Sequence, residues 1–376
     1  MRYPFKNLIF QGGGVRSFAY HGVIRGLAAR NLLGQIERVG GTSAGAMLAA
    51  ILSFRLGVEE SIALYNTLDY AKIPGLKTTV RMPSRLIGAV RSKEMAGNVD
   101  GLNRLLREYG WYDTSYAYKW LLTTIAAQTG YGTATFADFR NHGFRDLYIT
   151  ATNISRHQLE VFSAENTPDV PVADALLLSQ SIPLFFAAPR FDGKQINDEE
   201  GDYYGDGAIL SNFPLHLFDQ PQYISTQQSL SYGVNWETLG VRHYTPADCP
   251  DAGQREINNI ASYITNLFET WLDAQAVGYN QQLLDKRRTI EVSNCCVSAT
   301  DFHIQPTLLD ESYQKLVAAG ETAVTDYLDN YTPPPTTTPP RACPREYATC
   351  VQQIVIRVVD SLSSSSPVNR FRLLMF

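Results

Sequence analysis

A serine held between two glycines constrains this chain more than any other feature. The pentapeptide Gly-Thr-Ser-Ala-Gly at 41–45 follows a strand-like stretch at 36–39 and precedes a run of strong helix formers at 46–52. A serine at such a strand-to-helix elbow has its hydroxyl lifted clear of the backbone, and the following helix start favours negative charge there. The pattern predicts that Ser43 is a nucleophile. A glycine-rich turn with an ordinary serine would give the same pentapeptide, so the pentapeptide alone does not decide between the two.

A glycine triplet occupies an earlier junction of the same kind. A predicted strand at 6–10 runs into glycines at 12–14, and a helix is expected over 18–33. Bare backbone N–H groups beside a helix start suit an anion or oxyanion. A dinucleotide-binding fingerprint would need glycine at position 17, where the chain has Ser17. The triplet therefore indicates an oxyanion loop or, failing that, a tight turn without a ligand.

An Asp-Gly pair far downstream is the third feature. Asp206 lies in an aromatic segment, and an Asp-Gly pair alone most often marks a turn. Rival carboxylates precede it at Asp198, Glu199, Glu200 and Asp202, but their spacing is not that of an EF-hand. No spaced Cys/His cluster is present either, so we expect neither a metal ion nor a cofactor.

In this order, the three segments resemble the patatin-like phospholipase family. The family's early strand, glycine-rich loop, G-x-S-x-G elbow and distant Asp-Gly-Gly/Ala all have counterparts here, and similar blocks occur at 135–139, 147–153, 175–186 and 313–328. The resemblance covers roughly residues 5 to 330. It departs at Gln11 and Ser17, where many members have aspartate or serine and glycine respectively.

The resemblance implies a fold and a domain layout. The fold would be a three-layer α/β/α patatin-like fold with a central, mostly parallel sheet. Residues 1–331 would form the phospholipase domain, with a helical cap region at about 55–130. A Pro/Thr-rich linker and a C-terminal tail would occupy 332–376, outside the resemblance.

The resemblance also implies the site and its chemistry. Ser43 would attack the acyl ester of a phospholipid, with Asp206 as its partner in a dyad, in a phospholipase A-type hydrolysis without a cofactor. Burial would raise the pKa of Asp206 and make it a better proton acceptor. The remaining motif residues are Gly12, Gly13 and Gly14 as the oxyanion hole, Arg16 as support for that loop, and Gly41, Gly45, Gly207 and Ala208 around the two catalytic positions.

Three alternatives stay open. A Ser-His-Asp triad would recruit His216, His243 or His303. The chain would then be an esterase or acyltransferase of another type. A catalytically silent lipid-binding or scaffold protein could keep the same fold. A protein activator is a further partner that the sequence neither requires nor rules out.

Charge and composition bear on partners. The net charge is −5 and charged residues make up only 18% of the chain, below the roughly 25% of average soluble proteins. An acidic chain without a recognition module argues against nucleic acid. One basic segment interleaved with apolar residues predicts peripheral contact with an anionic membrane: Lys72, Lys77, Arg81, Arg85, Arg91 and Lys93.

Targeting signals and cysteines indicate a cytoplasmic protein. The start of the chain lacks the extended apolar region of a secretory signal, and no apolar run is long enough to span a bilayer. We therefore expect a soluble cytoplasmic chain with peripheral membrane association, while a signal-less export route stays open. The five cysteines predict free thiols in a reducing compartment.

Overall fold

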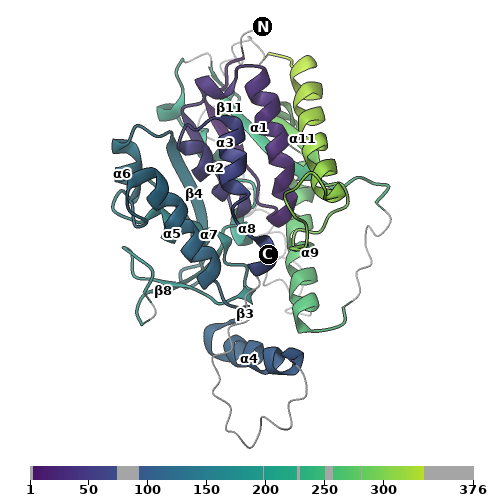
Figure 1. The fold of residues 1–376 in the computed structure, drawn as a ribbon. Helices are drawn as coiled ribbons and strands as arrows, with labels where there is room; N and C mark the ends of the chain where they lie inside the picture. The colour runs from purple at the N-terminus through teal and green to yellow at the C-terminus, as the bar shows by residue number, and fades with distance from the viewer. Residues whose placement is uncertain are drawn as a thin grey trace, which may run out of the picture. The chain divides into compact units, whose positions relative to one another are not determined.

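A mixed β-sheet with helices packed against it organises the chain (Figure 1). The computed structural model describes residues 3–73, 93–197, 199–226, 229–249, 257–280 and 282–333, without the side chains of 93–98 and 261. Of the predicted features, the basic residues from 77 to 91, Asp198 and the tail after 333 lie outside this part of the chain. Within it, the α/β class expected from the sequence is confirmed.

The described sheet has eight strands, and its central part is parallel. The order is β12-β11-β1-β2-β4-β8-β7, with β5 also paired to β4. The parallel strands are β12 (Thr289–Ser293), β11 (Thr238–Tyr244), β1 (Asn7–Phe10), β2 (Arg38–Thr42) and β4 (Asp146–Asn153). The antiparallel strands are β5 (Gln158–Ser163), β7 (Arg190–Phe191) and β8 (Asp202–Asp206). The carboxyl ends of β1 and β2 therefore meet at one edge, which is where ligands bind in open α/β sheets.

Helices and two small strand pairs complete the described chain. The helices are α1 (Ala19–Ala29), α2 (Ala44–Ser53), α3 (Val58–Tyr65), α4 (Lys93–Glu108), α5 (Ser115–Thr129), α6 (Phe136–Asn141), α7 (Val172–Gln180), α8 (Ala208–Ser211), α9 (Ile260–Asn280), α10 (Leu283–Arg287) and α11 (Glu311–Asp329). The pairs are β3 (Gly110–Tyr112) with β6 (Leu184–Phe186), and β9 (Leu230–Ser231) with β10 (Val234–Asn235). No described helix is both long and apolar enough to cross a membrane.

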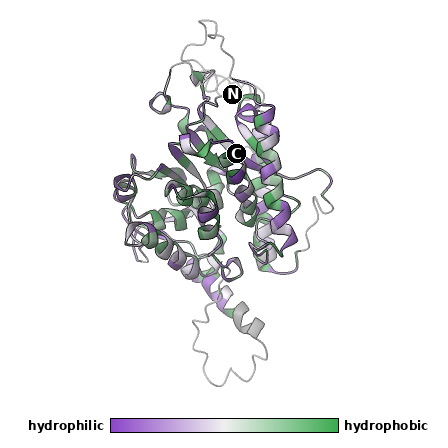
Figure 2. Cartoon of the chain, turned by 45° about the horizontal axis from the view of Figure 1, so that its top comes forward, coloured by the Kyte–Doolittle hydropathy of each residue, from purple (hydrophilic) through white to green (hydrophobic). Residues whose placement is uncertain are grey.

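Alternating side chains of the strands build cores on both faces of the sheet. In β1, Leu8 and Phe10 enter the main core with α1, α2, α7 and α11, whereas Ile9 points to the opposite face. There it packs with Leu215 and Phe218 of a 3-10 turn. This period of two follows from the pleat of a strand. Hydropathy colouring shows helices that carry both hydrophobic and hydrophilic residues around this sheet (Figure 2).

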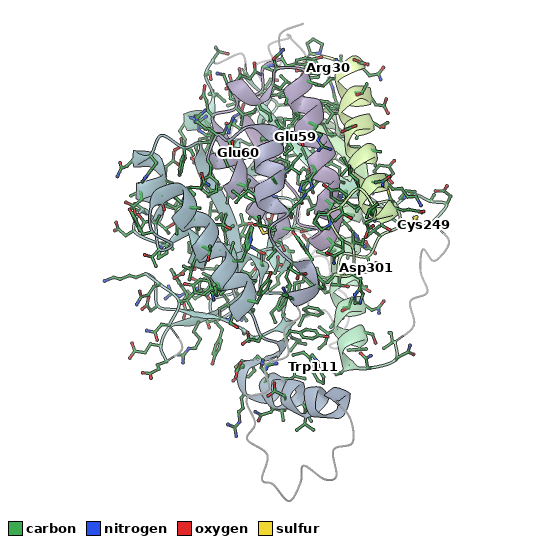
Figure 3. All side chains as sticks on the ribbon, viewed as in Figure 1. Arg30, Glu59, Glu60, Trp111, Cys249 and Asp301 are labelled. Atoms are coloured by element: carbon green, nitrogen blue, oxygen red, sulfur yellow. A yellow bond between two sulfur atoms is a disulfide. The ribbon has the colours of Figure 1, made fainter. Side chains whose placement is uncertain are left out.

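The expected cap region is helical where it is described. It contains α3, α4 and α5, with β3 between the last two. Trp111 of β3 lies against α4 (Figure 3), where a Cβ on Gly101 would come within 2.6 Å of the indole. The predicted helix over 18–33 is shorter than expected, because a 3-10 turn at Gly14–Phe18 precedes α1 and Asn31 has a positive φ just after it.

The cysteine expectation is wrong for one pair. Cys249 and Cys296 form a disulfide, while Cys295 is free. Both cysteines follow neighbouring parallel strands, since Tyr244 at the end of β11 is paired with Ser293 at the end of β12. Because the chain leaves both strands at the same edge of the sheet, residues far apart in sequence are brought together. An odd number of cysteines does not reveal such a pairing.

Candidate active site

The strand register brings Ser43 and Asp206 to the same level of the sheet. Thr42, the last residue of β2, is paired with Thr150 of β4. Asp206, the last residue of β8, is paired with Ala151, the next residue of β4. Ser43 follows Thr42 directly, so β4 aligns the two residues across an intervening strand. Their side chains meet: the Ser43 hydroxyl donates to Asp206 Oδ2 over 2.7 Å.

Ser43 has the backbone conformation of a strained elbow. Its φ and ψ are 55° and −129°, a region that non-glycine residues rarely occupy. Its backbone N–H donates to the Ser179 hydroxyl over 2.8 Å, which fixes the turn from the side of α7. A Cβ on Gly45 would lie 2.5 Å from the Gln11 carbonyl oxygen, so the elbow packs directly on the end of β1. The sequence predicted this turn but gave no signal for Ser179.

Asp206 is fully buried and held at both carboxylate oxygens. Oδ2 accepts from Ser43, and Oδ1 accepts from the Ala208 N–H over 2.8 Å. Its backbone is fixed too, since its N–H donates to the Ser181 carbonyl and its carbonyl accepts from Thr152 Oγ1. Burial raises the pKa of Asp206 from 3.8 to about 7, although the hydrogen bonds from Ala208 and Ser43 act to lower it. A carboxylate with such a pKa is a competent proton acceptor near neutral pH.

The glycine loop leaves two amides available beside Ser43. The Gly12 N–H already donates to the Asn212 carbonyl over 3.0 Å, and Asn212 Nδ2 returns a bond to the Gly12 carbonyl. Among the described residues, the Gly13 and Gly14 N–H groups have no acceptor. Of the three predicted glycines, Gly13 and Gly14 are thus the ones with free donors. Gly12 instead fixes the loop.

A segment after β12 supports this loop. The Val15 N–H donates to the Ala299 carbonyl over 3.0 Å. A Cβ on Gly14 would lie 1.9 Å from that same oxygen, and Gly14 has a φ of +54°, so glycine is required there on two grounds. Buried Arg16 donates to the Val297 carbonyl over 2.8 Å and pairs with Glu269 of α9 at 3.4 Å. Arg16 was predicted as a support, whereas Val297, Ala299 and Glu269 carried no recognisable sequence signal.

An apolar pocket opens next to Ser43. Besides Ser43 and Gly14 it is lined mostly by aliphatic and aromatic side chains: Ala44, Met47, Tyr70, Ile73, Thr114, Ala117, Leu121, Leu177, Gln180, Ile182, Phe186 and Phe302. The lining comes from α2, α5, α7, β6 and the segments at 70–73 and 302. A wall of this chemistry suits a hydrocarbon chain rather than a polar group.

None of the three histidines proposed for a triad is a hydrogen-bond partner of Ser43 or Asp206 among the described residues, although the ring of His243 lies against Gly13. In the part of the chain that the structure describes, the Asp206 carboxylate accepts hydrogen bonds from the Ser43 hydroxyl and the Ala208 N–H. His216 pairs with Asp219 and Asp285. His243 is buried, stacks on Tyr20 at 4.5 Å, and has its pKa lowered to about 3 by burial and by the nearby arginines.

The described part of the site does not contain a set of metal ligands. The described residues contain no group of three or more His, Cys, Asp or Glu side chains arranged to hold a metal ion. One predicted rival of Asp206 has other partners. Asp202 accepts from Asn153 and Arg156, which lower its pKa, and Asp198 lies outside the described chain.

Comparisons with known proteins point to one family. The model of the patatin-like phospholipases matches residues 8–219. The uncharacterized protein YqhO of Bacillus subtilis (strain 168) is 27% identical over 304 residues, which are 79% of this chain and 90% of that protein. Probable lipid hydrolase 463L of Invertebrate iridescent virus 6 is 22% identical over 213 residues, covering 57% of this chain and 63% of the viral protein.

The fold has a solved counterpart. The crystal structure of VipD from Legionella pneumophila superposes with a TM-score of 0.51 at 18% sequence identity, covering 87% of this chain and 67% of VipD. At this identity the likeness concerns the fold alone. It agrees with the mixed sheet and flanking helices described above.

Proposed function

Because the chain belongs to the patatin-like phospholipase family, we propose that it is a phospholipase A-type lipid acyl hydrolase acting through Ser43 and Asp206. Family membership supports lipid hydrolysis in general, and the dyad and the phospholipid substrate are the proposal's own content. The observation that carries it is the 2.7 Å hydrogen bond from a strained serine to a buried carboxylate beside an apolar pocket. The proposed catalytic domain spans 1–331, with linker and tail at 332–376.

The first half-reaction would form an acyl-enzyme. Ser43 Oγ attacks the ester carbonyl carbon while its proton passes to Asp206 Oδ2. The carbonyl π electrons move onto oxygen, and the Gly13 and Gly14 N–H groups donate to this oxyanion. Collapse of the intermediate breaks the bond to the alcohol, and the departing lysophospholipid oxygen takes the proton from Asp206.

The second half-reaction would regenerate the serine. A water molecule gives a proton to Asp206 and attacks the acyl carbon. The new tetrahedral intermediate is held by the same two amides, and Ser43 leaves with the proton from Asp206. The fatty acid is released. The raised pKa of Asp206 serves both steps, because the carboxyl group must accept and return a proton near neutral pH.

Substrate and partners follow from the same site. The apolar pocket would take the acyl chain, and the protein would meet the lipid surface peripherally. Of the six basic residues for which the sequence predicts contact with an anionic membrane, Lys72 is the one whose side chain the structure describes. Lys72 itself pairs with Asp69 at 2.9 Å. Whether a protein activator is needed belongs to the test below.

The test is fatty-acid release from mixed phospholipid vesicles by the wild type, Ser43→Ala and Asp206→Asn. We expect release by the wild type alone, with all three proteins folded by circular dichroism. A fluorophosphonate probe should label the wild type at Ser43. If Asp206→Asn keeps wild-type activity while Ser43→Ala is inactive, the base lies elsewhere and a histidine triad returns.

The silent-scaffold alternative has its own signature. A lipid-binding protein without catalysis would show neither release nor labelling by the probe. An enzyme that awaits an activator would release little fatty acid but would still react with the probe, since its serine is activated by Asp206. The two assays together therefore separate the three cases.

A further inference from the structure

Helix α9 presents an apolar face outward. Four large side chains at helical spacing are exposed on one side of it: Ile260, Tyr263, Leu267 and Trp271. Tyr263, Leu267 and Trp271 are 52%, 48% and 46% exposed. The helix has two charged residues, and neither lies on this apolar face. Glu269 is buried and pairs with Arg16 of the site loop. Asp273 follows one turn later on the same side, where it lines a cavity with Arg16 and Arg242. A surface helix of a globular protein ordinarily shows the reverse pattern, with charge outward.

The inward face of α9 packs against residues that line the acyl pocket. Ile264 is buried in a cluster with Ile182, Phe185 and Phe186, and Phe268 and Phe302 pack against this cluster. Ile182, Phe186 and Phe302 also line the pocket beside Ser43. One face of α9 therefore packs against the pocket lining, and the opposite face, which is also apolar, points outward.

A second helix, on the other side of β6, also exposes apolar side chains. Strand β6 carries Phe186 into the pocket and pairs with β3, on which α4 packs. Helix α4 exposes Val99, Leu102 and Leu106, and Leu106 is 72% exposed. In Figure 1, α4, β3 and α9 gather at one end of the described chain. Exposed apolar side chains that gather in one region of a surface mark an interaction site.

We propose that the outer face of α9, continued by α4, is the surface through which this protein docks on a neutral or zwitterionic lipid bilayer. This inference rests on the proposed function, since it assigns the route by which a lipid reaches the pocket. Apolar and aromatic side chains beside a pocket mouth insert at the level of the headgroups and acyl-chain boundary. Because the outer face of α9 carries no charged side chain, attachment through this face relies on apolar burial and not on attraction to anionic lipids.

The lipid surface fits this face better than the other occupants. A bilayer seated on α9 would lie next to the residues that line the acyl pocket. A second copy of the chain or the segment after Pro333, seated on the same face, would separate those residues from the lipid. Both rival occupants are outcomes of the experiment below.

The experiment uses the full-length protein with Leu267→Asp, Trp271→Asp and the double variant. Binding to phosphatidylcholine vesicles is measured by co-sedimentation at about 0.1 M and about 1 M NaCl, conditions that differ about threefold in screening length. Fatty-acid release from the same vesicles, hydrolysis of a soluble short-chain ester and fluorophosphonate labelling are measured in parallel. Trp271→Phe is the conservative variant. Leu283→Asp is the matched control, since Leu283 is 75% exposed on α10, which leads into the opposite end of the sheet at the start of β12.

We expect the double variant to bind vesicles on the order of 100-fold more weakly, because two half-exposed apolar side chains lose their burial in lipid. Its vesicle hydrolysis should fall with binding, while soluble-ester hydrolysis and labelling stay at the wild-type level. Trp271→Phe and Leu283→Asp should bind as the wild type does, and wild-type binding should survive high salt.

Three results overturn the proposal. The first is unchanged vesicle binding by the double variant, and the second is wild-type binding that disappears at high salt. The third is a change in oligomeric state by size-exclusion chromatography with vesicle binding unaltered, which would make the face a protein contact. Failure of the proposed function looks different, because it would remove labelling and soluble-ester hydrolysis from the wild type itself.

Discussion

Replacing Asp206 by asparagine should inactivate the enzyme and stabilise its fold at neutral pH. Burial raises the pKa of Asp206 from 3.8 to about 7, a difference of about 3 units, or about 4 kcal/mol at 1.36 kcal/mol per unit. Because the folded-state pKa lies above the unfolded one, the contribution of Asp206 to stability is fully present below about pH 4. It is lost as pH rises through 7. Asparagine keeps the shape of the side chain but does not ionise, so it escapes this loss.

The assay is urea unfolding of the wild type and Asp206→Asn at about pH 5 and about pH 8. The difference in the free energy of unfolding, variant minus wild type, should be about 3 kcal/mol larger at the higher pH. In parallel, wild-type kcat/KM should rise with pH around an apparent pKa near 7. Asp219→Asn is the matched control, because its effect on the free energy of unfolding should change with pH in the opposite direction. Burial acts to raise the pKa of Asp219, but hydrogen bonds from His216 and Arg288 outweigh it and lower that pKa. A stability difference for Asp206→Asn that does not change with pH would refute the reasoning.

Three further substitutions probe the loop, the elbow and the pocket. Gly14→Ala should lower kcat by about 10²-fold or more, because its Cβ would meet the Ala299 carbonyl and displace an oxyanion donor; fluorophosphonate labelling rates and circular dichroism check this. Ser179→Ala leaves the buried Ser43 N–H without its acceptor and should cost about 1–3 kcal/mol in thermal or urea unfolding, with a matching loss of activity. Ala117→Phe narrows the apolar pocket and should shift ester preference toward shorter acyl chains, measured as kcat/KM over a chain-length series; an unchanged series would exclude this pocket as the acyl site.

The elbow at Ser43 was predictable because its signal is local. A G-x-S-x-G elbow needs only a strand, a turn and a helix that are adjacent in sequence, and Ser43 has the expected strained conformation at that junction. The parallel α/β fold follows from the same pattern repeated at the glycine triplet. Asp206 was found through resemblance rather than from its own surroundings, since an Asp-Gly pair by itself most often predicts a turn.

The supports of the site were not predictable, because they depend on long-range packing. Ser179 lies on α7 and Ala299 lies after β12, and both reach the site only once the sheet has formed. The occupied Gly12 amide is a similar case, because its acceptor, Asn212, is two hundred residues away in the chain. The Cys249–Cys296 disulfide depends on the pairing of β11 with β12. No local pattern encodes these partners, as each of them is specified by the register of the sheet.

Two features of the site oppose folding, and their joint presence bears on function. The positive φ of Ser43 costs on the order of 1–3 kcal/mol, and the buried carboxylate of Asp206 costs up to about 4 kcal/mol above pH 7. Together they are comparable with the net stability of about 5–15 kcal/mol of an ordinary protein. A protein that only bound lipid would become more stable by replacing either residue, without losing the apolar pocket. A strained serine hydrogen-bonded to a destabilising carboxylate therefore favours an acyl-transfer enzyme over a silent scaffold.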